Sequence, residues 1–374
     1  MSRVEICKVD GYTQVEDILK RVLPTFSSFN KLSGKRVLLK INLLTYAKPE
    51  YAVTTHPEFV RALIRVFKSI NCVVSVGDGP SEAGRSFLEK VYRDSGIKKV
   101  CCEENVPLID FIESIDIKNN ENKVGKIIPV AKAIKEVDYI VNVPKLKTHG
   151  LTYITCGVKN LFGVIPGVKK SEYHLRLKTL PNFSAFLVDV ASTIKPVMTI
   201  VDGVLSMEGD GPRNGKARLT NLILLSEDVF SLDWVASEII GLKPILVPTN
   251  KEAYVRGLVK PENIEITGIP LKNAIIKDFE MIHKPVTPLP LPTVVNSFLE
   301  NYIAGKPYFN DNLCNKCLTC VKNCPAKALK KVNGKIEIDR KNCIKCYCCA
   351  EFCPNGAVKI KYSWLSRWLR TKIK

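Results

Sequence analysis

The chain has 374 residues, of which 46% are hydrophobic and 25% are charged. These shares are typical of a globular protein and exclude a fibrous or wholly disordered chain, and the length suggests two to three domains. Lys and Arg outnumber Asp and Glu by 56 to 37, a formal net charge of +19. No apolar run approaches the roughly 18 residues that cross a bilayer, and the N-terminus lacks a signal peptide's apolar run. We therefore expect a cytoplasmic protein with reduced cysteines, 14 in all, in which a cluster of cysteines indicates metal binding rather than disulfides.

The segment 1–283 is predicted to form one α/β domain. Short apolar runs, which suit strands buried on both faces, lie at residues 36–42, 72–77, 138–143, 198–202 and 222–226. Helical periods lie between several of them, at residues 56–70, 182–194 and 228–240. Alternating strands and helices predict an α/β body with a largely parallel sheet.

Polar side chains follow several of these strands at the point where each strand ends. Lys40 and Asn42 end the first run, Asp78 follows the second, and Lys147 follows the third. Ligand sites of open α/β sheets gather beyond the carboxyl ends of the strands. We therefore expect these four residues to bind a cofactor or substrate. Lysines together with glycine-exposed N–H groups suit an anion such as a carboxylate or a phosphate.

The candidate catalytic residues are His149, Lys159 and His174. Two of the chain's four histidines thus fall in one polar segment after a buried strand, which favours a functional site. Either histidine suits an acid, a base or a metal ligand, and Lys159 suits an anion. The alternative is that all three are solvated loop residues. A glycine-rich turn at 202–215 is expected to line the same crevice or a domain interface.

The C-terminal part carries a duplicated cysteine pattern. Cys-x2-Cys-x2-Cys-x3-Cys-Pro occurs at 314–325 and again at 343–354, and the spacing between corresponding cysteines is constant. In such duplicated domains three thiolates of an iron–sulfur cluster come from one loop and the fourth comes from the other half. The predicted ligand sets are Cys314, Cys317, Cys320 and Cys353 for one [4Fe–4S] cluster, and Cys343, Cys346, Cys349 and Cys324 for the other. Zinc is the alternative, but structural zinc sites usually pair two short Cys-x2-Cys units. Cys348 is out of register and is interpreted as a bystander thiol.

Residues 307–361 resemble bacterial-type ferredoxins with two [4Fe–4S] clusters. Over 307–358, nine Lys and Arg against four Asp and Glu leave a net charge of +5. Free ferredoxins of this type are generally acidic. We therefore expect this domain to transfer electrons as an attached part of the protein and not as a soluble carrier. An Asn-Gly hairpin turn is predicted at 332–335.

Two further segments flank the ferredoxin-like domain. A proline-rich connector with a short helix is expected over 284–306. The tail, 362–374, has the pattern of a basic amphipathic helix, which suits either a membrane surface or packing against the protein.

The body resembles the domain-of-unknown-function family 362 over about residues 30–280. The resemblance rests on the segment 144–149 with the later run 157–163, and on similar motifs at 54–58, 76–80 and 208–212. Members of that family are often fused to such a ferredoxin. A weaker likeness to the nickel-pincer lactate racemases implies that His149 is catalytic, that Lys159 tethers the pincer nucleotide and that His174 binds nickel. The racemases' other histidine-rich loop has no clear match, so nickel is not predicted.

These observations favour an iron–sulfur oxidoreductase. In this hypothesis the ferredoxin domain exchanges electrons with an anionic substrate or cofactor in the body, and with a redox partner protein. The alternative is a non-enzymatic electron carrier or assembly factor whose body docks a partner. A further metal or small-molecule cofactor in the body is left open. We do not expect a nucleic-acid partner, because no nucleic-acid-binding motif accompanies the positive charge.

Overall fold

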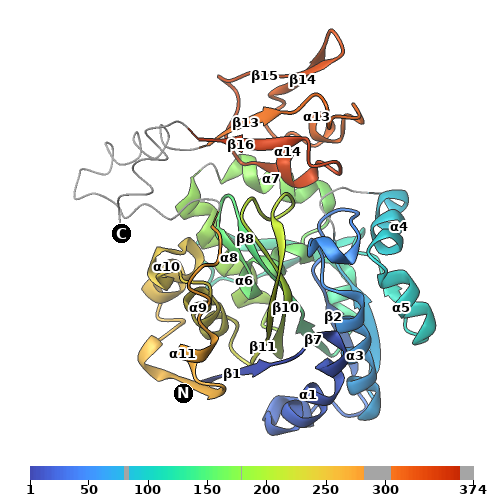
Figure 1. Cartoon of the computed structure of the whole chain (residues 1–374), viewed down its shortest axis with the longest axis vertical. Coiled ribbons are helices and arrows are strands. Elements are labelled where there is room, and N and C mark those ends of the chain that lie inside the picture. The colour runs from blue at the N-terminus through green and yellow to red at the C-terminus, as the bar shows by residue number, and fades with distance from the viewer. Residues whose placement is uncertain (80–83, 178, 282–304, 363–374) are drawn as a thin grey trace.

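The computed structural model describes residues 1–79, 84–177, 179–281 and 305–362, and Figure 1 shows the ferredoxin-like part above one end of the α/β body. The main sheet of the body has ten strands. Eight of them follow the order β12-β1-β11-β10-β7-β2-β3-β4, while β8 pairs with β10 and with β9. The strands of the body are β1 (Ser2–Lys8), β2 (Arg36–Lys40), β3 (Val73–Gly77), β4 (Leu108–Ile109), β7 (Tyr139–Asn142), β8 (Lys145–His149), β9 (Tyr153–Thr155), β10 (Met198–Glu208), β11 (Lys216–Ser226) and β12 (Ile264–Gly268), with a separate pair β5 (Ser114–Lys118) and β6 (Ile127–Ala131).

The predicted α/β body with a mainly parallel sheet is confirmed. Strands β10, β7, β2, β3 and β4 run parallel to one another, and all five strands expected from the sequence are present. Strand β11 runs antiparallel to both β10 and β1. This antiparallel part was not predicted, because the alternation of helices and strands does not report the direction of a hairpin partner.

Helices cover both faces of the sheet. The longer ones are α1 (Val15–Val22), α3 (Pro57–Ser69), α4 (Arg85–Asp94), α5 (Ile97–Glu103), α6 (Gly157–Leu161), α7 (Gly167–Arg176), α8 (Leu180–Ile194), α9 (Val229–Ile239) and α10 (Pro248–Val255), with the single turns α2 (Ser27–Asn30) and α11 (Leu271–Ala274). Val37 and Leu39 of β2 belong to the core with α1 and α3, whereas Leu38 packs with α6 and α8. Alternate residues of a strand point to opposite faces, so each face of the sheet has its own core.

The C-terminal domain has the duplicated architecture that its cysteines predict. Its elements are β13 (Lys306–Phe309), α13 (Thr319–Lys322), β14 (Leu329–Val332), β15 (Lys335–Ile338), α14 (Cys348–Phe352) and β16 (Val358–Lys361). Leu318 and Tyr347, which hold equivalent places before α13 and α14, both have a left-handed φ, 63° and 62°. The predicted hairpin is present, with Asn333 and Gly334 both at positive φ between β14 and β15, as a type I′ turn requires.

Two predicted segments lie outside the described residues. They are the connector, apart from its last two residues, and the basic tail beyond residue 362. In the part of the chain that is described, no helix is both long enough and apolar enough to span a membrane.

Candidate interdomain pocket

Strand β8 carries a row of basic side chains on one face. Lys145, Lys147 and His149 alternate with Leu146 and Thr148, and all five residues are buried. This strand was not predicted, and the alternative that His149 is a solvated loop residue is wrong, because the strand is buried throughout. These residues form a strand because β8 pairs with both β10 and β9 and because each of its basic groups has a polar partner inside the protein.

Lys145, the first of the row, is part of the framework. Its ammonium lies 2.7 Å from the Asp202 carboxylate and 3.0 Å from the Tyr12 hydroxyl, and the Tyr12 hydroxyl also donates to Asp202 at 3.0 Å. A buried ion pair needs such additional hydrogen bonds to offset the loss of water. This cluster fixes β8 against β10 and leaves Lys147 and His149 for the site.

Lys147 reaches the ends of the neighbouring strands. Its Nζ donates to Asn42 Oδ1 and to the Val53 carbonyl, each at 2.7 Å, and Asn42 Nδ2 donates to Asn160 at 3.0 Å. Burial, reinforced by the charge of Lys145, lowers the pKa of Lys147 to about 7. An ammonium has three N–H groups, so the third is available to a ligand.

Asp78 forms the floor of the site with two lysines. Its carboxylate lies 2.6 Å from Lys40 Nζ and accepts the backbone N–H groups of Leu43 and Gly79 at 2.7 and 2.8 Å. Lys170 donates to the Gly79 carbonyl. Burial lowers the pKa of Lys40, and it lowers that of Lys170 to about 7 against the opposing charge of Asp78.

Helix α6 positions Lys159. The carboxylate of Asp233 accepts the N–H groups of Gly157 and Val158, at 2.6 and 3.0 Å, where the helix begins. A Cβ on Gly157 would lie 2.6 Å from a Val229 methyl group and 2.9 Å from the same carboxylate, so only glycine permits this approach. The start of α6 is thereby fixed, and with it the place of Lys159.

Lys159 and His174 meet over two aromatic rings. Lys159 Nζ lies 4.8 Å from the centre of the Phe162 ring, and the His174 ring lies 4.3 Å from that of Phe183. Within the described parts of the chain, the Lys159 ammonium has no hydrogen bond or ion pair. Burial lowers the pKa of Lys159, and it lowers that of His174 to about 3. His174 is therefore neutral at physiological pH, and Lys159 faces aromatic rings instead of a hydrogen-bond partner within the described residues.

The ferredoxin-like domain adds a carboxylate to this site. Glu351 of α14 lies with Oε1 3.2 Å from His149 Nε2, and both side chains are almost fully buried. His149 Nδ1 accepts the N–H groups of Leu151 and Thr152, at 3.0 and 3.3 Å, so the proton of the neutral ring is on Nε2. Nε2 is close to Glu351, but the contact lacks hydrogen-bond geometry, and Oε1 has no hydrogen-bond partner among the described residues. Burial lowers the pKa of His149 and would raise that of Glu351, but His149, Lys159 and His174 together lower the latter to about 2.

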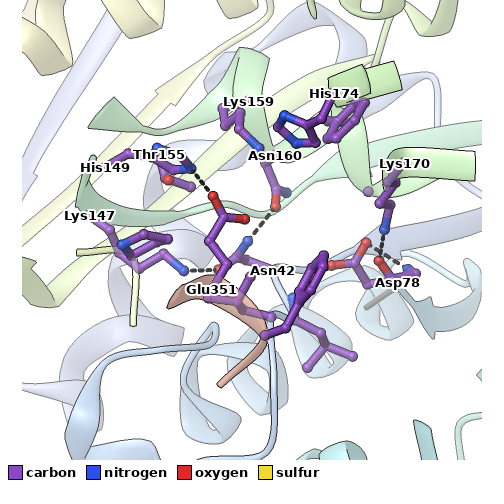
Figure 2. Close-up of a pocket in the computed structure, with 17 residues that line it drawn as sticks. Asn42, Asp78, Lys147, His149, Thr155, Lys159, Asn160, Lys170, His174 and Glu351 are labelled. Carbon is purple, nitrogen blue, oxygen red and sulfur yellow. Dashed lines mark hydrogen bonds and ion pairs between the residues drawn. The ribbon is translucent and has the colours of Figure 1, made fainter. Parts of the chain in front are cut away.

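These groups surround one cavity, shown in Figure 2, which we call the interdomain pocket. It encloses about 60 Å³, room for a handful of water molecules at roughly 10–15 Å³ each on this measure. Its polar lining comprises Asn42, Asp78, Lys147, His149, Thr155, Lys159, Asn160, Lys170, His174 and Glu351, and Phe352 of α14 closes it on the ferredoxin side.

The glycine-rich turn after β10 holds the two domains together. Arg213 donates to the carbonyl of Pro354, and Asn214 donates to that of Val358 at 2.9 Å. Asp210 lies 3.9 Å from Lys359, and Pro212 lines the interdomain pocket. Of the two roles expected for this turn, it therefore serves mainly as a domain interface.

The cysteines of the C-terminal domain fit iron–sulfur clusters. One cavity is lined by Cys314, Cys317, Cys320 and Cys353. Cys349 lies close enough to interact electrostatically with Cys324, Cys343, Cys346 and Cys320. Cys324 and Cys353 each accept a backbone N–H, from Ala328 at 3.3 Å and from Ala357 at 3.2 Å. The described residues contain no group of three or more His, Cys, Asp or Glu side chains placed around a single ion. Four cysteines around one cavity are the arrangement that a cubane cluster needs.

The predicted site residues are mostly brought together. His149, Lys159 and His174 share the interdomain pocket with Asn42, Asp78 and Lys147, whereas Lys40 lies beneath it in the Asp78 pair. The roles assigned to these residues stay predictions. Glu351 was missed; the equivalent residue of the first cysteine repeat is Lys322, so a departure from the duplication at an acidic residue was the available signal.

An α/β body with a [4Fe–4S] domain that closes its site defines an iron–sulfur protein. A model of the 4Fe–4S dicluster domain matches residues 306–354. The model of a domain of unknown function, DUF362, matches residues 37–238, more than half of the chain, and the chain belongs to this family. A thylakoid-associated protein of Synechocystis sp. is 31% identical over 274 residues, which are 72% of this chain and 83% of that protein.

Two solved structures resemble the chain more distantly. The lactate racemase apoprotein of Thermoanaerobacterium thermosaccharolyticum is 16% identical with a TM-score of 0.34, over 59% of this chain and 54% of that one. A Thermotoga maritima protein is 13% identical with a TM-score of 0.37, over 69% of this chain and 60% of that one. At these values neither likeness supports a conclusion about chemistry. No racemase role is therefore assigned to His149, Lys159 or His174.

Proposed function

We propose that the protein is a redox enzyme in which the ferredoxin domain exchanges electrons with a small anion held in the interdomain pocket. One observation carries the proposal. Glu351 and Phe352, which directly follow the cysteine loop at 343–349, line the same cavity as His149, Lys159 and His174. Residues of the ferredoxin domain and polar residues of the body thus line the same cavity.

The charge of the pocket supports an anionic ligand. Lys147, Lys159 and Lys170 line it together with two acids, Asp78 and Glu351, and Asp78 is already paired with Lys40. Lys159 is half-buried, and its Nζ has no hydrogen-bond acceptor among the described residues, only the rings of Phe162 and Phe183 at 4.8 and 6.0 Å. An anion in the pocket would give Lys159 a hydrogen-bonding partner and favour its charged form.

The protein's own groups supply orientation and protons. When bound, two [4Fe–4S] clusters supply single electrons, two in all from a fully reduced domain. His149 holds a proton on Nε2, and Lys147 and Lys170, with pKa values of about 7, exchange protons near neutral pH. The partly apolar walls keep bulk water from the ligand.

The test compares wild-type protein with Lys159→Ala, both purified without oxygen and reduced with dithionite. After removal of the reductant, each is mixed with the low-molecular-mass fraction of a cell extract, and reoxidation of the clusters is followed by their visible absorbance. We expect Lys159→Ala to lose about tenfold or more in rate, as for a lost charge-assisted hydrogen bond. Lys169→Ala is the matched control. Lys169 lies in α7 beside Lys170, but its ammonium donates a hydrogen bond to the Ser114 hydroxyl and does not line the pocket. Equal rates for all three proteins would favour the electron carrier or assembly factor.

We also propose a peripheral membrane contact through residues 362–374. The Synechocystis relative is named for its association with thylakoids, and the segment 359–374 here carries six Lys or Arg and no acid. Basic amphipathic segments with tryptophans bind anionic bilayers. Anionic liposomes should sediment the full chain but not a chain ending at residue 361, and equal sedimentation of both would end this proposal.

A further inference from the structure

With the ferredoxin domain docked, both nitrogens of His149 have a close neighbour. Nδ1 accepts two backbone N–H groups, and Nε2 faces the Glu351 carboxylate at 3.2 Å. An imidazole has only these two polar positions. While Glu351 is in place, His149 therefore has no position left for a substrate.

The space beside Glu351 is also small. The interdomain pocket encloses about 60 Å³, which suits a few atoms. Glu351 itself is a carboxylate next to His149, in a cavity that Lys147, Lys159 and Lys170 also line. Glu351 lies in a cavity whose other polar lining residues all belong to the body.

From these contacts we propose that Glu351 is an internal stand-in for the carboxylate of the substrate. The inference rests on the proposed function and adds the ligand class, a small carboxylate, together with a gating step. The substrate's carboxylate takes the place of Glu351 beside His149, and α14 withdraws from the pocket as it binds. Docking of α14 and binding of the substrate carboxylate exclude each other.

The interface is built for such an exchange. Besides Glu351, the polar contacts between the domains run mainly from Arg213, Asn214 and Asp210. Two of these are hydrogen bonds to backbone carbonyls, and they lie along one turn at the rim. The turn can keep hold of the domain while Glu351 and Phe352 of α14 leave the pocket wall.

Competition with an internal ligand has a measurable consequence. When only a fraction of molecules has an open site, the apparent affinity of a ligand falls by that fraction. Removing the internal carboxylate should therefore raise the affinity for an external one, by about tenfold or more if Glu351 contributes as a charge-assisted hydrogen bond does.

The experiment measures acetate binding by calorimetry to the oxidised, cluster-loaded full chain. Affinity should rise from wild type to Glu351→Gln, which keeps an acceptor for His149 but loses the charge, and further to Glu351→Ala. Glu337→Gln is the control, because it removes one exposed acid from the same domain. The two Glu351 substitutions should raise the affinity for inorganic phosphate less than they raise the affinity for acetate. An equal gain for both anions, no gain for either, or tighter acetate binding by wild type would overturn the proposal.

Unmodified protein provides a second and independent reading. Saturating acetate should speed amide hydrogen exchange in Cys348–Phe352, because α14 leaves the pocket. Slower exchange there would mean that acetate binds beside Glu351, and would sink the gating step. Both assays need binding alone and no turnover, so their failure leaves the electron-transfer proposal standing, and failure of the reoxidation assay leaves the binding result standing.

Discussion

The ion pair between Lys40 and Asp78 offers a quantitative test of how the pocket floor is held. The atoms Nζ and Oδ1 are 2.6 Å apart and both side chains are almost fully buried. At an effective dielectric constant of about 20, two unit charges at this distance attract by roughly 6 kcal/mol. Desolvation cancels most of that gain, yet removing one partner of a buried pair typically costs about 3–5 kcal/mol.

We expect Lys40→Met to fall near the lower end of that range. The Asp78 carboxylate keeps the N–H groups of Leu43 and Gly79, which partly satisfy it. Asp78→Leu should cost at least as much, since Lys40 then keeps only the Ile41 carbonyl at 2.9 Å and a weak contact with Asn160. The double variant should cost clearly less than the sum of the two, because no unpaired charge is left.

The assay is thermal unfolding of the body, followed by far-ultraviolet circular dichroism of the full chain without oxygen. For a domain of this size a loss of 1 kcal/mol lowers Tm by about 2–4 °C, so each single variant should melt about 6 °C or more below wild type. Additive losses in the double variant would refute the reasoning, and so would single variants that melt within about 2 °C of wild type.

Four further outcomes are expected. Affinity for acetate should fall several-fold as pH rises from about 6 to about 8. The reason is that Lys147 and Lys170, with pKa values of about 7, lose their positive charge over this range. Calorimetry that finds the same affinity across the range would contradict this. Arg213→Ala should speed proteolytic separation of the two domains while iron content stays the same. Cys346→Ala should lower the iron content from about eight to about four per chain, whereas Cys348→Ala should keep about eight, as measured by metal analysis. Wild-type protein should carry acid-labile sulfide in equal amount, and stoichiometric zinc without sulfide would overturn the ligand assignment.

Local patterns in the sequence predict most of the fold. The strands with mainly apolar runs, such as residues 36–40 and 73–77, are buried on both faces beyond their first residue, so their composition identifies them. Strand β8 escaped detection because its inward side chains are basic. The alternation of Lys145, Lys147 and His149 has the two-residue period of a strand, but such a row is stable inside a protein only with partners from distant segments, and the local sequence does not name them.

The site is predictable only in part for the same reason. Side chains at the carboxyl ends of neighbouring parallel strands must lie close together, which is why Asn42 and Asp78 were found after β2 and β3. Lys147 was found because it follows the run 138–143, although it lies within strand β8. Glu351 belongs to another domain, and its approach to His149 depends on how the two domains dock. Lys40 has the right strand position, yet its side chain is held by Asp78, a pairing that no spacing rule gives.

The place of Glu351 directly after the cysteine loop links the pocket to the maturation of the protein. Helix α14 begins at Cys348 and ends one residue before Cys353, so cysteines predicted to ligate both clusters lie within it and at its end. The loops of such domains take their conformation from the clusters they bind. If the clusters bind as predicted, we expect delivery of iron and sulfide to order α14 and so to close the pocket. Protein made under iron limitation should then hold more chains with an open pocket.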